Sequence, residues 1–247
     1  MLEPVDFIDS IPSTNQLLSE LPPVPLSGCG KAVATFVQTQ GKGQRGNTWL
    51  TEPGINIHYS LLYGPNGIPS HNQFIISQAV SLVVKSFLSE YTTGITVKWP
   101  NDIFWKNKKL GGILIEHQIK GSFVAQTIIG IGLNINQASF PAELPDAVSL
   151  TTITGQMYDL TELTNKFHQA LCKELDALTM EQGDDIQRYY INNLYRRDGF
   201  HPYADGNGPF DARICGIGAQ GNLILEHEDG SVKSYAFKEV QYCPETI

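Results

Sequence analysis

The stretch GITVKWPNDIFWKNKKLGGILIEHQIKGSFVAQTIIGIGLNIN, residues 94–136, decides the fold class. It contains three segments with strand composition, GITVKWPNDIFW, KLGGILIEHQIK and FVAQTIIGIGLNIN, and no helical pattern separates them. Consecutive strands without intervening helices usually pair antiparallel. The stretch therefore predicts an α+β fold, in which helices pack on a mixed, largely antiparallel central sheet.

Helices are predicted on both sides of this meander. Helical periodicity marks PSTNQLLSEL (12–21), PSHNQFIISQAVSLVVKSFLSEY (69–91) and TELTNKFHQALCKELDAL (161–178). The first two begin with a serine followed three residues later by a glutamine, at Ser13 and Ser70. That spacing is typical of a capping box, so both serines are predicted to begin a helix.

Two further strands are predicted upstream of the meander, in AVATFVQTQ (32–40) and NIHYSLLY (56–63). In the second, every other residue is apolar, namely Ile57, Tyr59, Leu61 and Tyr63. This period of two is typical of a strand with one face buried in a core.

The composition changes towards the C-terminus. The segment PFDARICGIGAQGNLILEHEDGSVKSYAFKEVQYC, residues 209–243, contains short strands separated by turns, with Asp229-Gly230 placed as a hairpin turn. We therefore predict two domains, a larger one over residues 1–198 and a small all-β domain over residues 199–247.

The bulk composition excludes several classes of protein. With 247 residues, 41% hydrophobic and 17% charged, the chain has the composition of a globular protein with ample core material. The net charge of −8 argues against a general nucleic-acid binder. The four cysteines are far apart, without a C-x-x-C pair or a secretory leader, which favours a reducing cytoplasm. No apolar run is long enough for a membrane helix.

The stretch QTQGKGQRGNTW, residues 38–49, spaces Gly41, Gly43 and Gly46 as G-x-G-x-x-G, the fingerprint of dinucleotide-binding enzymes. That fingerprint requires a helix directly after its last glycine, because the helix N-terminus holds the pyrophosphate. Here the following residues lead to the turn Pro53-Gly54 and show no helical periodicity. The sequence therefore does not predict a dehydrogenase.

The same loop has the composition of an anion-binding site. Its glycines free the backbone so that consecutive N–H groups can face a ligand, and the cations Lys42 and Arg45 favour a phosphate. A flexible surface loop is the alternative explanation. The loop alone does not decide between the two.

Two further stretches carry charged residues beside predicted strands. Lys98-Trp99-Pro100-Asn101-Asp102 ends a strand with a lysine and an aspartate, which suits a charged ligand or a magnesium-bound phosphate. Lys109 stands immediately before the strand that begins Leu110-Gly111-Gly112. The alternatives are an ordinary Pro-Asn-Asp turn and a solvated lysine.

Taken together, these motifs are specific. GKGQRGNTW, VKWPNDIFW, KKLGGILIE and IGIGLNIN, preceded by PSTN, resemble the catalytic domain of the biotin–protein ligases in order and spacing. The resemblance covers residues from about 7 to 154. It extends more weakly to the C-terminal segment, where that family has a small SH3-like β-barrel.

The resemblance implies an ATP-dependent ligase. With Mg²⁺, such an enzyme converts biotin and ATP into biotinyl-5′-AMP and pyrophosphate, and then passes the acyl group to a lysine of a biotin carboxyl carrier domain. The first step brings a carboxylate to a polyanionic triphosphate, so positioned cations and backbone donors are needed. Two alternatives stay open: a lipoate–protein ligase, which is expected to lack KWPND, and a non-catalytic biotin- or nucleotide-binding module.

The resemblance also implies roles by motif position, leaving the metal ligands unassigned. The catalytic group is led by Lys109 and includes Arg45, Lys98 and Asp102. The biotin site comprises Ser13, Thr14, Asn15, Gln38, Gly41, Lys42, Gly43, Lys109, Gly112, Gly130 and Gly132. The ATP and adenylate site comprises Lys42, Gly43, Gln44, Arg45, Trp49, Asn101, Asp102 and Asn134.

The sequence departs from the family pattern in the glycine loop. The fourth position of that loop is often an arginine that retains the adenylate, whereas this chain has Gln44, followed by Arg45. Glutamine offers hydrogen bonds without charge. Either Arg45 substitutes for the missing cation, or the adenylate is held less tightly.

The remaining expectations concern partners. The S-T-N motif begins at Ser13, which leaves no space before it for the helix-turn-helix domain that some members of the family carry. Together with the acidic net charge, this predicts a monofunctional ligase that does not bind DNA. Related enzymes often pair through the central sheet, so a homodimer is a further expectation.

Overall fold

The structure is a computed structural model that describes residues 2–21 and 27–245, except for the side chain of Arg45. Its larger part is a seven-stranded sheet in the order β1-β2-β3-β7-β6-β5-β4. The strands are β1 (Val5–Phe7), β2 (Gly28–Thr35), β3 (Ile57–Gly64), β4 (Ile95–Lys98), β5 (Asp102–Trp105), β6 (Lys108–Lys120) and β7 (Phe123–Leu133). Only β1 and β2 pair in parallel among these described strands. The predicted mixed, largely antiparallel sheet is therefore confirmed.

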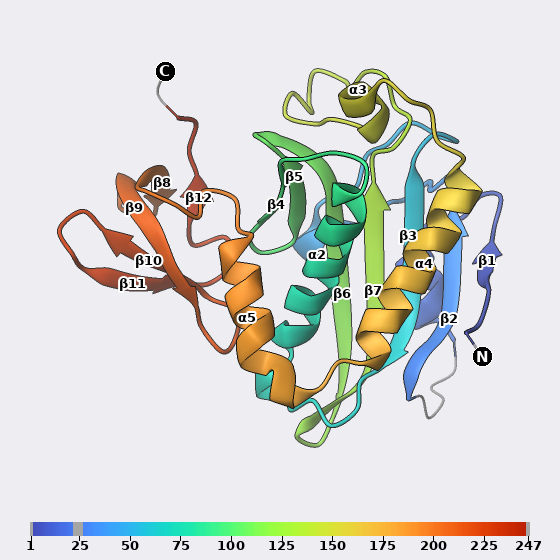
Figure 1. Ribbon diagram of the computed structural model, residues 1–247, viewed down its shortest axis with the longest axis horizontal. Helices are drawn as coiled ribbons and strands as arrows, with labels where there is room; N and C mark the ends of the chain where they lie inside the picture. The colour runs from blue at the N-terminus through green and yellow to red at the C-terminus, as the bar shows by residue number, and fades with distance from the viewer. Residues whose placement is uncertain (1, 22–26, 246–247) are drawn as a thin grey trace.

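The two faces of this sheet are covered differently. Helices α2 (Phe74–Ser89) and α4 (Leu160–Asp176) lie across one face (Figure 1). The alternating apolar residues of β3 are all buried in the main core on that side, namely Ile57, Tyr59, Leu61 and Tyr63. Helix α1 (Thr14–Ser19) lies on the other face, where Leu18 packs with Leu62 of β3. The period of two in β3 thus separates two faces, but the prediction of a single buried face was wrong, because α1 covers the second face and all eight residues of β3 are buried.

The meander differs from its prediction in one respect. The segment 94–105 forms two antiparallel strands, β4 and β5, instead of one, and Trp99-Pro100-Asn101 turns the chain between them. Proline has no N–H to donate to a neighbouring strand, so it ends β4. As a consequence Lys98 and Asp102 stand directly opposite each other across the hairpin.

The helices also differ from their predictions. Ser13 does cap α1, where it accepts a hydrogen bond from the Gln16 N–H at 3.5 Å. The capping prediction at Ser70 was wrong, because Ser70–Asn72 forms a 3₁₀ turn and α2 begins at Phe74. Two short helices were not predicted, α3 (Leu150–Thr154) and α5 (Gly183–Asn192). Tyr190 of α5 is buried, and Ile186 and Ile191 are partly buried and pack against the same core.

A second, five-stranded antiparallel sheet follows α5, in the order β11-β10-β9-β8-β12. Its strands are β8 (His201–Asp205), β9 (Gly208–Ile217), β10 (Leu223–His227), β11 (Val232–Tyr235) and β12 (Gln241–Tyr242). The hairpin turn at Asp229-Gly230 is confirmed, and Gly230 has a φ of 81° there. No pairing among the described strands joins β12 to β11, so the structure shows a sheet instead of a closed barrel. The domain boundary at residue 198 stays a prediction.

The second sheet packs against the hairpin of β4 and β5. The indole N–H of Trp99 donates to the carbonyl oxygen of Gly221 at 2.8 Å, and its ring meets that of Phe237 at 6.3 Å between centroids. The side chain of Gln187 in α5 donates to the carbonyl oxygen of Ile217 at 2.9 Å. These contacts bring residues 237–242 beside the first sheet. None of the described helices is long and apolar enough to cross a membrane.

Candidate active site

A cavity of about 890 Å³ opens on the α1 side of the first sheet. Its walls come from α1, the glycine loop (Gly41–Trp49), strands β3, β5, β6 and β7, and the C-terminal segment 237–242. It brings together most of the predicted site residues: Ser13, Thr14, Asn15, Gln38, Lys42, Gly43, Gln44, Trp49, Lys98, Asn101, Asp102, Lys109, Gly112, Gly130 and Gly132. Motifs separated by more than a hundred residues thus meet in one place.

Three predicted site residues are not among the described residues of the cavity wall. Gly41 is not part of the cavity wall, and its carbonyl oxygen accepts the Trp49 N–H at 2.9 Å to close the glycine loop. Asn134 also lies outside the wall, and its amide donates to the carbonyl oxygens of Val148 and Lys109 at 3.3 and 3.5 Å. Asn134 therefore links Lys109 of β6 to Val148, which lies just before α3. The side chain of Arg45 lies outside the described residues.

Hydroxyl and amide groups form one end of the cavity. The Ser60 Oγ atom lies 2.7 Å from Thr14 Oγ1 and 2.6 Å from Asn15 Oδ1. The backbone N–H of Thr14 donates to Gln38 Oε1 at 2.9 Å. The Asn15 amide also donates to the carboxylate of Glu116 at 2.7 Å. Since Thr14, Asn15 and Ser60 are all buried, this network holds a fixed pattern of donors and acceptors.

Three glycines of the sheet make room for this end of the site. A Cβ on Gly130 would overlap the Asn15 side chain. A Cβ on Gly132 would lie 2.6 Å from the Trp49 ring, and one on Gly112 would lie 3.0 Å from it. The glycines therefore allow Asn15 and Trp49 to lie directly on β6 and β7.

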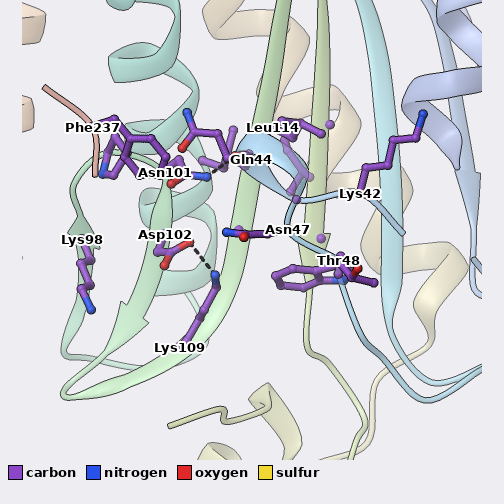
Figure 2. Close-up of a pocket in the computed structure, with 18 of the residues that line it drawn as sticks. Lys42, Gln44, Asn47, Thr48, Lys98, Asn101, Asp102, Lys109, Leu114 and Phe237 are labelled. Atoms are coloured by element: carbon purple, nitrogen blue, oxygen red, sulfur yellow. Dashed lines mark hydrogen bonds and ion pairs between the residues drawn. The ribbon is translucent and has the colours of Figure 1, made fainter. Parts of the chain in front are cut away.

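A charged pair forms the other end. The Nζ of Lys109 lies 2.7 Å from an Asp102 carboxylate oxygen, and Figure 2 shows the two side chains pointing at each other. The same Nζ lies 5.4 Å from the centre of the Trp49 ring. A register shift between Ile103 and Phe104 interrupts the pairing of β5 with β6 beside this pair. Both side chains stay partly exposed to the cavity, so the charges remain available to a ligand.

Lys98 is a second cation, held differently. Its Nζ lies over the rings of Phe104 and Tyr242, at 4.6 and 4.9 Å from their centres. Burial lowers the pKa of Lys98, and the nearby positive charge of Lys109 lowers it further, whereas Asp102 opposes both effects. Tyr242 belongs to β12, so the second sheet helps to position this lysine.

The glycine loop has no helix after Gly46, which agrees with the exclusion of a dinucleotide site. Residues Gln44–Gly46 form a single 3₁₀ turn, and the N–H of Gly43 donates to the carbonyl oxygen of Asn47 at 2.7 Å. Lys42 is exposed and extends away from Lys109 (Figure 2). The Oε1 atom of Gln44 is buried without a hydrogen-bond partner.

Several residues in or beside the cavity wall were not predicted from the sequence. His58 lines the cavity from β3 and is 2% exposed, and the fully buried Ser60 lies behind the wall, where it bonds Thr14 and Asn15. The signal was present, because His58 and Ser60 alternate with the apolar residues that face α2 and α4. Phe237 and Tyr242 also line the cavity, and no local pattern links them to residues far earlier in the chain.

Comparison with known proteins agrees with this geometry. The model of the biotin/lipoate A/B protein ligase family matches residues 7–134, more than half of the chain. The chain belongs to this family. The matched span contains α1, the glycine loop and the whole Lys98–Lys109 region, which together form most of the cavity wall.

Individual relatives of the ligase family are similar over much of the chain. The bifunctional ligase/repressor BirA of Bacillus spizizenii is 34% identical over 229 residues, which cover 84% of this chain and 65% of the relative. The biotin–[acetyl-CoA-carboxylase] ligase of Mycobacterium tuberculosis is 32% identical over 147 residues, covering 57% and 50%. This chain therefore spans less than two thirds of the length of either relative.

A solved structure has the same fold. The biotin protein ligase from Aquifex aeolicus, in complex with biotin and ATP, superposes with a TM-score of 0.74 at 23% identity. The superposition covers 97% of this chain and 99% of that one. Both sheets of the present structure thus fall within the shared fold.

Proposed function

We propose that this chain is an ATP-dependent biotin–protein ligase. The observation that carries the proposal is that one cavity joins the hydroxyl and amide network of Thr14, Asn15 and Ser60 to the Lys109–Asp102 ion pair. The first group suits a small polar ring, and the second suits a carboxylate beside a phosphate. The names of the Mycobacterium tuberculosis relative and of the Aquifex aeolicus structure support the same substrate.

The network also favours biotin over lipoate. A ureido ring carries two N–H donors and a carbonyl acceptor, whereas the dithiolane ring of lipoate has only weakly bonding sulfur atoms. A cavity end lined with hydroxyl and amide groups offers hydrogen-bond partners to a ureido ring that a dithiolane ring cannot use well. Lipoate is therefore the second candidate.

In the first reaction step, an oxygen of the biotin carboxylate attacks the α-phosphorus of ATP. A carboxyl–phosphate bond forms, the bond to the bridging oxygen breaks, and pyrophosphate leaves with the bonding electrons. The Lys109 ammonium group, at the phosphate end of the cavity, offsets the repulsion between carboxylate and triphosphate and stabilises the charge of the transition state.

In the second step, the neutral amine of a carrier lysine attacks the acyl carbon of biotinyl-5′-AMP. The amide bond forms, the amine loses a proton, and AMP leaves. The Trp49 ring covers β6 and β7 beside Lys109, which keeps water from the mixed anhydride before the carrier arrives.

Magnesium accompanies ATP in this proposal. Within residues 2–21 and 27–245, no cluster of three His, Cys, Asp or Glu side chains could hold a metal ion by itself. Mg²⁺ at nucleotide sites is typically held by one or two carboxylates together with substrate phosphates. The Asp102 carboxylate fits that pattern. The amide nitrogen of Asn101 donates to the carbonyl oxygen of Ile113 at 2.7 Å, which fixes the orientation of the side chain. Its side-chain oxygen can then serve as a further ligand for Mg²⁺.

The test is pyrophosphate release from the purified protein with ATP and Mg²⁺, with biotin, lipoate or neither added. Release that depends on biotin supports the proposal. Release that depends on lipoate assigns lipoate as the substrate. If neither acid causes release, the chain is a non-catalytic binding module.

Replacing Gln44 with arginine is expected to slow the loss of biotinyl-5′-AMP to solvent by about tenfold. The reason is that Gln44 lines the cavity without a charge, and arginine adds a cation with several donors beside the phosphate. The measurement is the rate at which free adenylate appears in solution. Gln40→Arg, at an exposed position outside the cavity wall, is the matched control. An unchanged rate would show that position 44 does not retain the adenylate.

The partner in this proposal is a biotin carboxyl carrier domain. The cysteines at positions 29, 172, 215 and 243 are all free thiols in the structure, which suits a reducing compartment such as the cytoplasm. Pairing of two copies through the central sheet stays a prediction, and the molecular mass in solution tests it.

A further inference from the structure

His58 is the most unusual polar residue of the cavity wall. It is 2% exposed, and neither of its ring nitrogens has a hydrogen-bond partner. Burial lowers the pKa of His58 to about 4, so the ring is neutral at physiological pH. A neutral imidazole offers one N–H donor and one bare nitrogen acceptor. Leaving both unpaired in a buried position is costly, so the site is arranged to receive a polar group.

The neighbouring polar groups are already engaged. The Asn15 side chain uses its oxygen with Ser60 and its nitrogen with Glu116 and the carbonyl oxygen of Leu114. The oxygen of Gln38 accepts the Thr14 N–H. The ring nitrogens of His58 are therefore among the few buried cavity atoms that still have their full bonding capacity. Trp49 Nε1 is another, next to Gly132.

The sheet register places His58 at one end of the cavity. Four residues on adjacent strands form one row across the sheet. In order, they are His58 on β3, Gly132 on β7, Gly112 on β6 and Asp102 on β5. With about 4.8 Å between neighbouring strands, His58 stands roughly 14 Å from Asp102 along this row. It lies two residues from Ser60 on the same strand face. His58 thus belongs to the hydroxyl and amide end, distant from the Lys109–Asp102 pair.

We propose that His58 hydrogen-bonds the ureido group of biotin and is a specificity-determining residue of this enzyme. The inference rests on the proposed function, because it takes biotin as the acyl substrate. The biotin carboxylate must reach Lys109, so the ureido group is the polar part of biotin left for the opposite end. The bare nitrogen of the imidazole accepts a ureido N–H, or its N–H donates to the ureido oxygen. A dithiolane ring offers neither partner.

The experiment is titration calorimetry with biotin in the absence of ATP, on wild type and His58→Phe. The loss of a buried hydrogen bond is expected to weaken biotin binding by about tenfold or more. The KM for ATP is expected to stay within about twofold, because the nucleotide end is remote. His58→Gln keeps a donor and an acceptor and is expected to retain most of the affinity.

His117→Phe is the matched control. Burial lowers the pKa of His117 to about 4 as well, but its ring bonds Thr127 at 3.0 Å and does not line the cavity. Equal affinity of wild type and His58→Phe, or an equal loss in His117→Phe, would overturn the inference and leave the proposed function intact. Absence of biotin binding in the wild type would overturn the proposed function itself.

Discussion

Replacing Lys109 with alanine is expected to lower the rate of biotinyl-5′-AMP formation by about 10³-fold, with the protein still folded. Lys109 places its ammonium group 2.7 Å from Asp102 at the phosphate end of the cavity. Without it, the repulsion between the biotin carboxylate and the triphosphate is no longer offset by a cation at this position. The ion pair is partly exposed, so its loss costs little stability.

The measurement is single-turnover formation of biotinyl-5′-AMP together with the thermal unfolding midpoint. Lys108→Ala is the matched control, because Lys108 precedes Lys109 on the same strand and is exposed outside the cavity wall. This control should keep the wild-type rate. Normal adenylate synthesis by Lys109→Ala would refute the catalytic assignment of Lys109.

Replacing Gly130 with alanine is expected to weaken biotin binding by about 100-fold. The added Cβ would overlap the side chain of Asn15, which is 4% exposed and bonded to Ser60 and Glu116. Asn15 cannot turn aside without breaking those hydrogen bonds. The substitution therefore disrupts the hydroxyl and amide end of the site as a whole.

Biotin calorimetry and the thermal unfolding midpoint together test this expectation. Gly216→Ala in β9 is the matched control, since its Cβ would meet only Ile224, at an ordinary 3.6 Å. We expect wild-type affinity in the control. An unchanged affinity in Gly130→Ala would mean that Asn15 does not position biotin.

The local order of the fold could be predicted from the sequence. The strands of the meander, the helices over 74–89 and 160–176, and the Asp229-Gly230 turn each follow from periodicity or turn chemistry within a few residues. The prediction failed where the same local pattern was compatible with a different structure. Ser70 had capping spacing, yet the chain there forms a 3₁₀ turn before α2.

The candidate site was predictable only in part. Motif resemblance named Thr14, Asn15, Lys109 and Asp102, and the structure brings them into one cavity. It could not show that Asn134 fastens two segments outside the cavity wall, because that depends on a contact with Val148. Nor could it show that the cavity wall includes Tyr242 from the second sheet.

The sequence by itself determined most of the strands and the longer helices, and which charged and glycine-rich motifs accompany them, because these depend on neighbours along the chain. Only the tertiary structure decided that His58 lines the cavity, that Ser60 bonds Thr14 and Asn15, and that Gly130 makes room for Asn15. The physical reason is register: a shift of one residue between β3 and β7 would turn those side chains to the opposite face. That register is fixed by packing of the whole sheet against α2 and α4, a contact among residues far apart in sequence.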